Sequence, residues 1–357
     1  MKIKELIQEM LRVNASDLFY RAGGTPHLRI DGKVIEVSKE VLTLDDVFNA
    51  IDELTVARQK EVFKNTSDVD FAVYLEGFKH RFRVSIFMQR NSPSIIMRNV
   101  RTATQTFEEL NLPVKVLQNL SMETRGLVLL TGSMGSGKST AIAAMIEYIN
   151  LNAKKHVLTI EEPIEFTFQD KDSIINQREL GLDVASYPVA LRAFTLQSPD
   201  VIFIGNIRDR ETMQAALTAA ETGVLVLSTL HTINATQSVE RIINFFPPHQ
   251  HEQVRAQLAS LLKGVISLRL VPFKDKPGRI PAYEIMLLTP TMSRLIREGK
   301  VWEMPQFLED GNVFDMQTFN QSLVRMVQKG LISEEVAFEF ADNREEFALA
   351  LRGIKKG

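Results

Sequence analysis

Residues 126–150 read Gly-Leu-Val-Leu-Leu-Thr-Gly-Ser-Met-Gly-Ser-Gly-Lys-Ser-Thr followed by Ala-Ile-Ala-Ala-Met-Ile-Glu-Tyr-Ile-Asn. The stretch opens with an apolar run, Leu127–Leu130, that is typical of a buried strand. Residues 132–139 then satisfy the pattern G-x-x-x-x-G-K-S/T. Apolar side chains follow at helical spacing, at Ile142, Met145, Ile146 and Ile149. A strand, a glycine loop and a helix in this order predict a phosphate-binding P-loop.

The residue types in this loop explain how it would hold a nucleotide. Its glycines permit backbone turns that a side chain would obstruct, so successive N–H groups can point at a phosphate. The N-terminus of the following helix adds a favourable partial positive charge. We expect Lys138 to bridge the β- and γ-phosphates of ATP and the Ser139 hydroxyl to ligate Mg²⁺. The expected nucleotide-binding residues of the loop are Gly132, Ser133, Met134, Gly135, Ser136, Gly137, Lys138, Ser139 and Thr140.

Length and composition limit the class of protein. With 357 residues the chain is long enough for two domains, and 45% hydrophobic with 24% charged residues is ordinary for a globular protein. The net charge of −2 provides no strong basic field, which disfavours a nucleic-acid binder. The absence of cysteine excludes disulfides and thiolate metal sites. No apolar run approaches the roughly 20 residues that span a bilayer, so we expect a cytoplasmic protein with only peripheral membrane association.

Two patterns divide the chain. Residues 1–100 mix helical spacing with short alternating strands, which predicts a compact α+β domain. Its expected elements are a helix at 3–13, a hairpin at 27–37 around Asp31-Gly32, one or two helices at 43–63, and strands at 68–75, 80–88 and 94–100. Residues 101–112 are more polar and are interpreted as a linker.

From residue 113 to 357 apolar strands alternate with helices, which predicts an α/β domain with a mostly parallel sheet. Besides the P-loop strand, we expect strands at 156–160, 201–204 and 225–230, helices at 208–220 and 250–265, and a largely helical segment from about 290 to 357.

Polar residues follow two of these strands, where a nucleotide hydrolase needs an acid to hold Mg²⁺ or to orient water. Glu161, Glu162 and Glu165 follow the strand at 156–160. They could form a solvated acidic loop, but their place after an apolar strand in a P-loop domain favours the site. Asn206 follows the strand at 201–204. Its amide can hold a water molecule by hydrogen bonds but cannot take the proton of that water.

Several basic residues have both a structural and a functional interpretation. His231 follows the strand at 225–230 and is either a structural residue or a sensor of the γ-phosphate. Arginines cluster on the last strands of the first domain, at Arg81, Arg83, Arg90 and Arg98. They form either a solvated basic face or a set of arginines that reach the phosphates of a neighbouring subunit. Arg255 has the same two interpretations.

Two segments carry a family resemblance. Thr159-Ile-Glu161-Glu-Pro-Ile-Glu165-Phe resembles the aspartate box of the secretion-superfamily ATPases, and Glu221-Thr-Gly-Val-Leu-Val-Leu-Ser-Thr-Leu-His231-Thr resembles their histidine box. The likeness covers essentially the whole chain and is strongest to the PilT/PilU family of type IV pilus retraction ATPases. The segments that resemble the PilU branch are residues 176–179, 208–213, 240–247 and 316–319.

The resemblance implies a ring of six subunits, either identical or mixed with another retraction ATPase, that acts with the inner-membrane platform of the pilus. It implies a PAS-like N-terminal domain, a RecA-like ATPase domain, and ATP between the two. By the family pattern, Lys138 and Ser139 bind nucleotide and Mg²⁺, and Glu161 helps to place the metal and water. His231 and the arginines of the first domain complete the site.

The chain departs from the family pattern near the expected chemistry. The acid of the Walker B segment is replaced by Asn206, the Asp of the aspartate box by Glu162, and a box histidine by Val224. The arginine before Gln-x-Pro-Asp is replaced by Leu196, and Ser133-Met134 alters the P-loop. Because the binding pattern is intact, we expect ATP binding with weakened hydrolysis. The alternatives are a fully active motor that uses another acid, such as Glu162 or Asp209, and a RecA-like nucleic-acid translocase.

Overall fold

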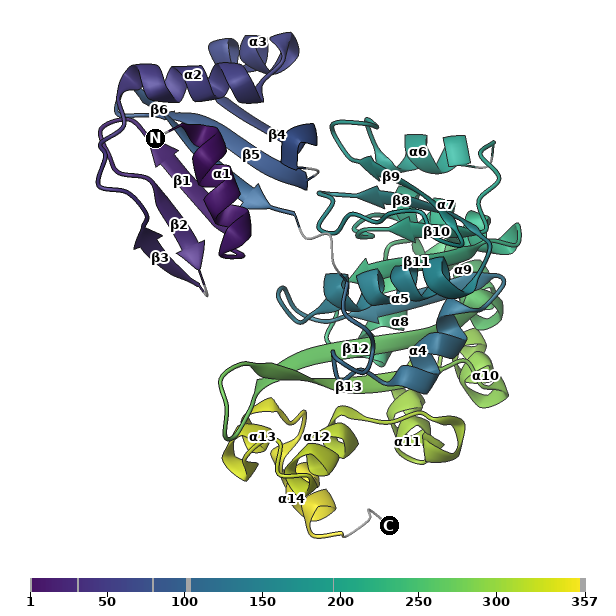
Figure 1. The fold of residues 1–357 in the computed structure, drawn as a ribbon. Coiled ribbons are helices and arrows are strands. Elements are labelled where there is room, and N and C mark those ends of the chain that lie inside the picture. The colour runs from purple at the N-terminus through teal and green to yellow at the C-terminus, as the bar shows by residue number, and fades with distance from the viewer. Residues whose placement is uncertain (1, 31, 79, 101–103, 195, 354–357) are drawn as a thin grey trace. The chain divides into compact units, whose positions relative to one another are not determined.

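The computed structural model describes residues 2–30, 32–78, 80–100, 104–194 and 196–353. The chain divides into two compact units, Met1–Ala103 with Glu165–Thr167 and Thr104–Ile164 with Phe168–Gly357. The sequence predicts a linker over 101–112, of which residues 101–103 lie outside the described residues. Each unit is described in turn below, with the element labels of Figure 1.

The first unit contains, in its described part, a six-stranded antiparallel sheet with strand order β3-β2-β1-β6-β5-β4 (Figure 1). The strands are β1 (Asp17–Arg21), β2 (His27–Ile30), β3 (Lys33–Glu36), β4 (Asp68–Leu75), β5 (His80–Gln89) and β6 (Ser92–Asn99). The helices α1 (Ile3–Arg12), α2 (Leu44–Leu54) and α3 (Ala57–Thr66) pack on β1, β6 and β4 respectively, and η1 (Glu76–Phe78) precedes β5.

Several of these elements were predicted because they have a clear period. Helix α1 buries Ile3, Leu6, Ile7 and Met10, which recur at helical spacing. Strand β5 buries every second side chain, at Phe82, Val84 and Ile86, so Arg81 and Arg83 share the opposite face. The expected helices, strands and hairpin strands of the first domain are therefore confirmed, although Asp31 of the hairpin turn lies outside the described residues.

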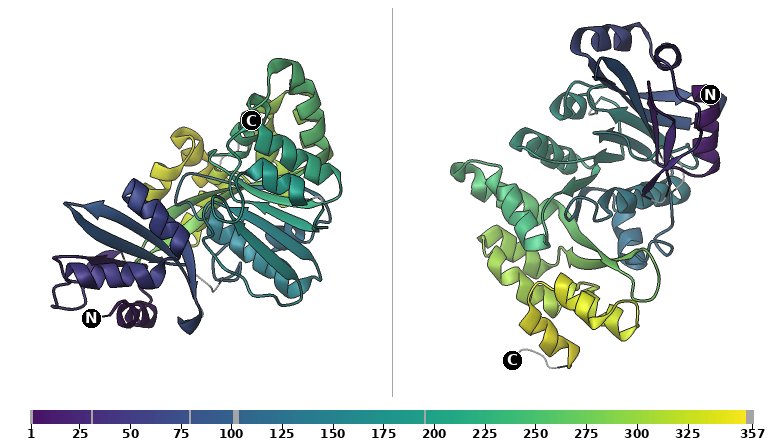
Figure 2. Two further views of the ribbon diagram at one scale, coloured as in Figure 1. Left: turned by 90° about the horizontal axis from the view of Figure 1, so that it is seen from above. Right: turned by 90° about the vertical axis from the view of Figure 1, so that its left-hand side faces the viewer.

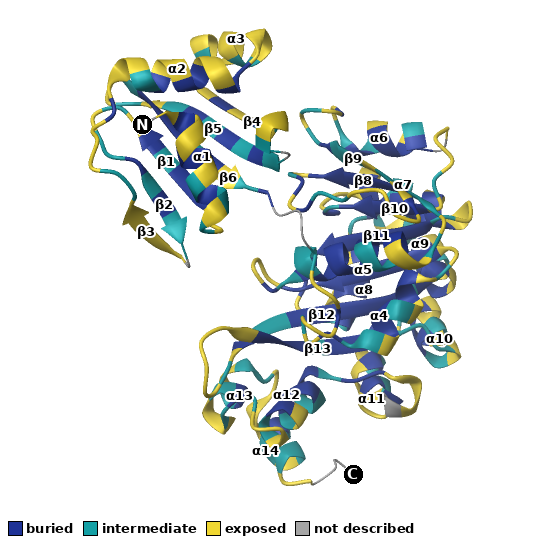
Figure 3. Ribbon diagram, viewed as in Figure 1, coloured by how far each residue is buried: buried dark blue, intermediate teal, exposed yellow. Residues whose placement is uncertain are grey.

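The second unit is built on a seven-stranded sheet, counted over its described residues, with order β13-β12-β7-β11-β10-β8-β9. All neighbouring pairs are parallel except β12 and β13. The strands are β7 (Gly126–Thr131), β8 (His156–Glu161), β9 (Ile174–Glu179), β10 (Val201–Ile204), β11 (Leu225–Leu230), β12 (Leu262–Pro272) and β13 (Arg279–Leu287). The central strands β7, β10 and β11 are buried along their whole length (Figure 3).

Helices cover both faces of this sheet (Figure 1, Figure 2). Alternate residues of β7 enter different cores: Val128 and Leu130 pack with α4 (Val114–Ser121) and α5 (Lys138–Asn152). Leu127 and Leu129 pack with the helices of the other face. Those helices are α6 (Tyr187–Phe194), α7 (Arg210–Glu221), α8 (Ala235–Asn244), α9 (His251–Leu261) and α10 (Pro290–Glu298), with η2 (Pro248–Gln250) before α9.

A third apolar cluster attaches the last helices to the far part of the β12–β13 pair. Val271, Ile280 and Ala282 of these strands pack with Phe319 and Phe347. The elements after α10 are η3 (Val301–Glu303), α11 (Met304–Glu309), η4 (Gly311–Phe314), α12 (Phe319–Gln328), α13 (Glu334–Phe340) and α14 (Arg344–Leu351). The prediction of a largely helical segment after residue 290 is confirmed.

One predicted helix is partly wrong. The expected helix at 250–265 ends at Leu261, and the chain continues as the long strand β12. A Cβ at Gly264 would lie 3.1 Å from the carbonyl oxygen of Met286, so the glycine allows β12 to pair closely with β13. Leu262 and Val265 continue the helical spacing, which is why the pattern alone extended the helix. The strands β9, β12 and β13 were not predicted at all.

Candidate functional site

The P-loop connects β7 to α5 and packs against β12. Gly132 has φ +144°, and a Cβ there would lie 2.5 Å from the carbonyl oxygen of Leu268. Gly137 has φ +97° and is the N-cap residue of α5. Both positions therefore require glycine, because L side chains rarely adopt these dihedral angles. Helix α5 begins at Lys138, so its free N–H groups point into the loop.

Lys138 is buried, with 7% of its surface exposed. Its Nζ donates to the carbonyl oxygens of Gly132 and Ser133, both at 2.8 Å. These contacts hold the ammonium group at the loop backbone. Ser139 and Thr140 are partly buried in the first turn of α5, directly after the lysine. The expected binding residues of the loop thus lie together.

The carboxyl ends of the neighbouring parallel strands meet at the same edge of the sheet. Ile204 of β10 pairs with Ile160 of β8, and Leu230 of β11 pairs with Thr131 of β7. Glu161, Asn206 and His231 come one or two residues after these paired positions, as the P-loop does. The edge beyond the carboxyl ends of parallel strands is where ligands bind in open α/β sheets.

Glu161 is the last residue of β8 and is 6% exposed. Its Oε1 accepts a hydrogen bond from Thr159 Oγ1 at 2.7 Å and from Gln177 Nε2 at 3.0 Å. Two side-chain donors from β8 and β9 therefore fix the carboxylate in one orientation. Gln177 was not identified from the sequence, because β9 was not predicted and nothing local marks it as a neighbour of Glu161.

Asn206 is 8% exposed, and its Oδ1 is buried without a hydrogen-bond partner among the described residues. The backbone around it is firmly held: Gly205 N–H donates to Ile160 O at 2.8 Å, and Thr229 Oγ1 donates to Gly205 O at 2.6 Å. Leaving a buried amide oxygen unpaired costs about 1–3 kcal/mol. Such an exception is typical of a position that faces a ligand or water.

His231 lies beside the lysine of the P-loop, with 3.5 Å between its Nδ1 and Lys138 Nζ. Burial lowers the pKa of His231, and the positive charges of Lys138 and Arg208 lower it further. The lowered pKa favours the neutral imidazole, which can donate one hydrogen bond and accept another. The structure thus brings His231 next to Lys138, one of the residues expected to bind phosphate.

The other carboxylates considered as replacement acids already have partners. Glu162 forms an ion pair with Arg208 at 3.1 Å, and both side chains are largely exposed. Asp209 is the N-cap of α7, where one oxygen accepts from Thr212 N–H at 2.8 Å and the other from Thr212 Oγ1 at 3.1 Å. Helix α7 consequently begins at Arg210 and not at the predicted position 208.

Several arginines on strands of the first unit share one face of its sheet. Arg83, Arg98, Asp17 and Arg29 form a row of directly paired residues across β5, β6, β1 and β2. Arg98 Nε donates to Asp17 Oδ1 at 2.8 Å, and Arg29 Nε donates to Oδ2 at 3.1 Å. Burial raises the pKa of Asp17, but hydrogen bonds from Arg98 and Ser16 bring it below its usual value. Arg98 therefore has a structural partner in its own unit.

Arg81 and Arg83 lie two residues apart on the same face of β5. Arg90 lies in the tight turn that joins β5 to β6, with φ +46°. Arg255 has a different location within the second unit. A Cβ added at Gly299, after the end of α10, would lie 3.2 Å from its Nη1. Inside one chain, Arg255 thus packs against α10.

Two cavities adjoin the P-loop edge. One of about 220 Å³ is lined by the loop and by Ile233, Leu268, Arg269, Leu270, Arg279 and Phe340. The other, about 420 Å³, is lined by His231, Arg208 and residues of α8, including Arg241. The sequence did not identify Arg269 or Arg279, because they belong to the strands β12 and β13 that were not predicted.

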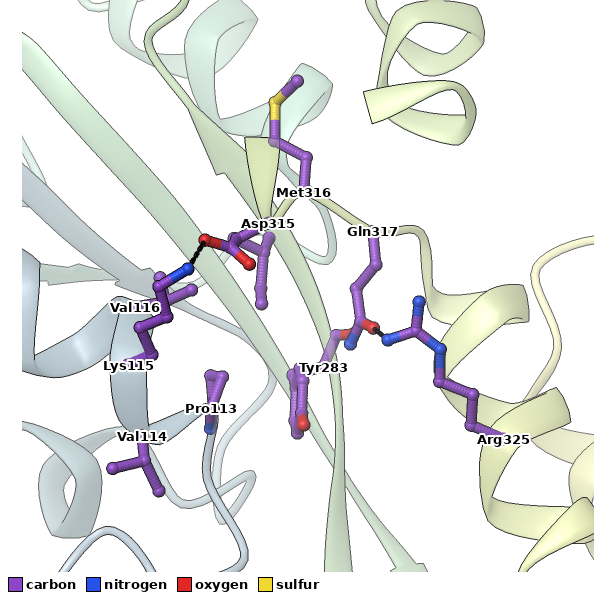
Figure 4. Close-up of a pocket in the computed structure, with 10 residues that line it drawn as sticks. Pro113, Val114, Lys115, Val116, Tyr283, Asp315, Met316, Gln317 and Arg325 are labelled. Carbon is purple, nitrogen blue, oxygen red and sulfur yellow. Dashed lines mark hydrogen bonds and ion pairs between the residues drawn. The ribbon is translucent and has the colours of Figure 1, made fainter. Parts of the chain in front are cut away.

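A further cavity of about 320 Å³ lies between α4, β13 and α12 (Figure 4). Lys115 forms an ion pair with Asp315 at 2.8 Å, and Arg325 Nη1 donates to Gln317 Oε1 at 2.6 Å. Gln317 Nε2 donates in turn to Tyr283 O at 3.0 Å. None of the site residues expected from the sequence lines this cavity.

The donor set at the P-loop fits ATP with Mg²⁺. The N-terminus of α5 offers free N–H groups at the loop, and the buried Ser136 Oγ lacks a hydrogen-bond partner among the described residues. A hydroxyl at Ser139 and a fixed carboxylate at Glu161 are oxygen ligands of the kind that Mg²⁺ prefers, usually with several retained waters. In the described part of the chain no three His, Asp or Glu residues gather into an all-protein metal cluster.

Comparison with known proteins agrees with this geometry. The family described as type II/IV secretion system protein matches residues 1–338. The type IV pilus ATPase PilU of Pseudomonas aeruginosa is 40% identical over 99% of this chain and 92% of its own length. The retraction ATPase PilT of the same organism is also 40% identical, over 97% of this chain and 100% of its own length. Equal identities do not separate the PilU branch from the PilT branch.

Solved structures give the same family. A crystal structure of the pilus retraction motor PilT with bound ADP has a TM-score of 0.89 and 41% identity, and covers 97% of this chain and 98% of its own. The ATPase DotB of Legionella pneumophila, at 22% identity and a TM-score of 0.76, shares the fold. No described helix is long and apolar enough to cross a membrane. The chain belongs to the PilT/PilU family of ATPases, with an N-terminal PAS-like domain and a RecA-like domain.

Proposed function

We propose that this protein is an ATP-binding ring subunit of a type IV pilus retraction machine whose own ATP hydrolysis is slow or depends on a partner. ATP and Mg²⁺ bind at residues 132–140, with Lys138 on the phosphates and Ser139 and Glu161 near the metal. Binding and hydrolysis are coupled to disassembly of the pilus; the names of the PilT relatives state, for those proteins, a pilus retraction ATPase and a pilus retraction motor.

The observation that carries the proposal is the buried Asn206 at the end of β10. The family pattern has a glutamate there, whereas this side chain is a neutral amide with an unpaired Oδ1. It is able to hold a water molecule but unable to accept its proton. Loss of a general base typically costs about 10²–10⁴ in rate. The lysine, the glycine cradle and the following helix remain, so binding persists.

The alternative is an active motor that uses another acid. The contacts of Glu162 and Asp209 weigh against these two residues, because one is paired with Arg208 and the other caps α7. Glu161 is the remaining candidate, but both of its described hydrogen bonds tie it to neighbours in β8 and β9. Residual hydrolysis then comes from positioning and charge stabilisation by the loop, Mg²⁺ and arginines.

We further propose a ring of six subunits, either identical or mixed with a second retraction ATPase, at the cytoplasmic face of the inner membrane. There it contacts the platform protein of the pilus. In the ring, Arg81, Arg83, Arg98 and Arg255 reach the nucleotide of a neighbouring subunit. Arg81 and Arg83 are the better placed for this, since Arg98 is held by Asp17 and Arg255 packs beside Gly299.

The test compares ATP turnover and equilibrium binding of a fluorescent ATP analogue for the unaltered chain and for Asn206→Glu. Tight binding with negligible turnover is expected for the unaltered chain, and a rise of about 10²-fold or more in kcat is expected for the glutamate variant. Asn206→Gln is the matched control, because the glutamine side chain has the length of glutamate without its charge. Lys138→Ala supplies the binding control and should lose the analogue.

Robust turnover by the unaltered chain, unchanged in Asn206→Glu, would contradict the proposal and direct attention to Glu161. A gain in Asn206→Gln equal to that in Asn206→Glu would show that size and not charge limits the rate. Repeating the assay with a PilT ATPase added tests the mixed ring, for which total turnover should differ from the sum of the separate proteins.

A further inference from the structure

Three polar side chains form a row across the edge of the sheet that carries the P-loop. Thr131 of β7, Ser267 of β12 and Glu284 of β13 occupy directly paired positions on neighbouring strands. Thr131 Oγ1 donates to Ser267 Oγ at 2.9 Å, and the Ser267 hydroxyl lies close enough to Glu284 to lower the pKa of its carboxyl group. Thr131 is the residue before Gly132. The row therefore ends, on one side, at the P-loop.

On its other side, Glu284 reaches the helix that follows His231. Its Oε1 accepts the N–H of Ala235, the first residue of α8, at 2.7 Å. A carboxylate is favourable at a helix N-terminus, where N–H groups lack partners within the helix. This contact spans 49 residues of sequence and joins an edge strand to the segment after β11.

The first turn of α8 also holds the segment next to His231. Thr232 Oγ1 and Ser238 Oγ share a hydrogen bond at 2.6 Å, and Ile233 N–H donates to Gln237 Oε1 at 2.9 Å. Ser238 Oγ additionally donates to Asn234 O at 2.6 Å. The segment that directly follows His231 is thus tied to the first turn of α8.

These contacts connect Glu284 with His231 and with the P-loop. His231 lies 3.5 Å from Lys138, Lys138 bonds Gly132 O, and Gly132 follows Thr131 at the start of the row. All of these residues are in the second unit, and Glu284, Ser267 and Thr131 are nearly or fully buried.

We propose that Glu284 is a positioning residue that sets the place of His231 relative to the P-loop, and that its protonation adjusts this placement. The inference rests on the proposed nucleotide site, because only there does the placement of His231 affect ATP. Glu284 lies on β13, two strands away from β7, which leads into the P-loop. It acts through Ser267 on one side and through the first turn of α8 on the other.

The carboxyl group of Glu284 can change its protonation state near neutral pH. Burial raises its pKa to about 7, against the opposing effect of the Ala235 N–H. The charged groups that act on it are Asp342, which raises the pKa, and Arg269, which lowers it. When ionised, the carboxylate accepts from both Ala235 and Ser267. When protonated, it carries a hydrogen on one oxygen, so it can donate to Ser267, which the carboxylate cannot do.

The experiment uses the full chain with Glu284→Met, which removes both acceptors at similar size, and Glu284→Gln, which keeps one acceptor but does not titrate. Ser267→Ala separates the row from Thr131. Ser322→Ala is the matched control: Ser322 Oγ accepts the N–H of Tyr283 at 3.2 Å, so it binds the same strand. Tyr283 faces the cavity of Figure 4, on the opposite face of β13 from Glu284.

The first readout is hydrogen exchange of the amides at 231–238, measured without nucleotide at pH values on both sides of 7 and corrected for intrinsic exchange. Glu284→Met should speed exchange of Ala235, and Glu284→Gln should restore most of the protection. Protection in the unaltered chain should change with pH near 7, and Glu284→Gln should show no such change. Unchanged protection of Ala235 in Glu284→Met would overturn the inference.

The second readout is kcat for ATP against the Kd of the fluorescent analogue, in the unaltered and Asn206→Glu backgrounds. Glu284→Met and Ser267→Ala should lower kcat by about 10- to 100-fold while Kd changes little. Should Glu284→Met fail to fold, Glu284→Gln alone decides, because a pH profile identical to that of the unaltered chain overturns the inference. Equal effects of Ser322→Ala would also overturn it. Because exchange needs no nucleotide, failure of ATP binding would count against the proposed function alone.

Discussion

At the scale of single residues, the site combines an intact binding lysine with a neutral strand-end amide. Lys138 Nζ donates to two backbone carbonyl oxygens at 2.8 Å, so a bound phosphate has to replace these hydrogen bonds. Asn206 has no described partner for its Oδ1. In the proposed function the two residues have different roles: Lys138 binds phosphate, and Asn206 cannot accept a proton.

His231 gives a pH prediction at this scale. Its pKa is lowered by burial and by the charges of Lys138 and Arg208, and the negative phosphates of ATP would offset those charges. Binding of ATP should therefore be accompanied by proton uptake, and affinity should increase as pH falls below the ordinary histidine pKa of about 6.5. Calorimetry in two buffers with different ionisation enthalpies measures the uptake.

The comparison variant for this prediction is His231→Gln, which retains hydrogen bonding without titration. Protonation of ATP itself contributes equally to both proteins. Equal proton uptake by the two would mean that His231 does not respond to the nucleotide.

At the scale of elements, the β12–β13 pair supports the P-loop. Gly132 packs against Leu268 of β12, and Arg269 and Arg279 line the adjoining cavity. The same end of this pair carries the last three helices, which pack on Val271, Ile280 and Ala282. The loop therefore depends on a part of the chain that lies more than a hundred residues later in the sequence.

Gly132→Ala tests this dependence. A methyl group would lie 2.5 Å from Leu268 O at a φ of +144°, so the loop must shift. We expect a loss of about 1–3 kcal/mol in unfolding free energy and of most nucleotide binding. Gly135→Ala has a positive φ but no atom within 4 Å, so it isolates the dihedral strain from the steric contact. Urea unfolding measures the stability of each variant, and analogue binding measures its affinity for nucleotide. If Gly132→Ala and Gly135→Ala lost binding equally, the contact with β12 would be excluded as the cause.

Asp209 gives a second prediction for an element. As N-cap of α7 it satisfies Thr212 N–H, so Asp209→Ala should cost about 1 kcal/mol of stability. ATP turnover, in the unaltered and Asn206→Glu backgrounds alike, should not change when stability is taken into account. A selective fall in turnover at unchanged stability would instead make Asp209 the missing acid.

The elements that the sequence predicted are those with a local signal. Helix α1 and strand β5 show clear periods, and the P-loop is recognised from its own residues. Strand β9 has only mixed burial, and β12 continues the helical spacing of α9, so neither has a distinct local pattern. The contacts of Glu161 with Gln177, and of Glu284 with Ala235, join residues 16 and 49 positions apart. Such contacts depend on the sheet order, which local patterns do not encode.

At the scale of the whole molecule, the buried Glu284 links folding to pH. Its pKa is raised from 4.5 to about 7, so the native state holds a proton that the unfolded chain releases. The stabilising contribution is complete below pH 4.5 and is lost as pH rises through about 7. Glu284→Gln has no titrating group at this position and so has no such loss. Its unfolding free energy should therefore rise relative to that of the unaltered chain between pH 4.5 and about 7, by about 3 kcal/mol at most.

Denaturant titrations of both proteins across this pH range provide the measurement. The difference in unfolding free energy between Glu284→Gln and the unaltered chain should increase with pH and level off above 7. Ser322→Ala serves again as a control, with a difference that does not depend on pH. A constant difference for Glu284→Gln would show that the carboxyl group titrates alike in the folded and unfolded chains.

The tight approach of Gly132 to Leu268 has a consequence for regulation. Because no space separates the loop from β12, a ligand that binds the surface of α12–α14 and displaces this strand must alter the affinity for ATP. Thermodynamic linkage makes the coupling mutual: ATP would change the affinity for that ligand by the same factor. A coupling of about 1–3 kcal/mol corresponds to roughly 5- to 150-fold. The C-terminal helices would then report the nucleotide state to whatever binds them.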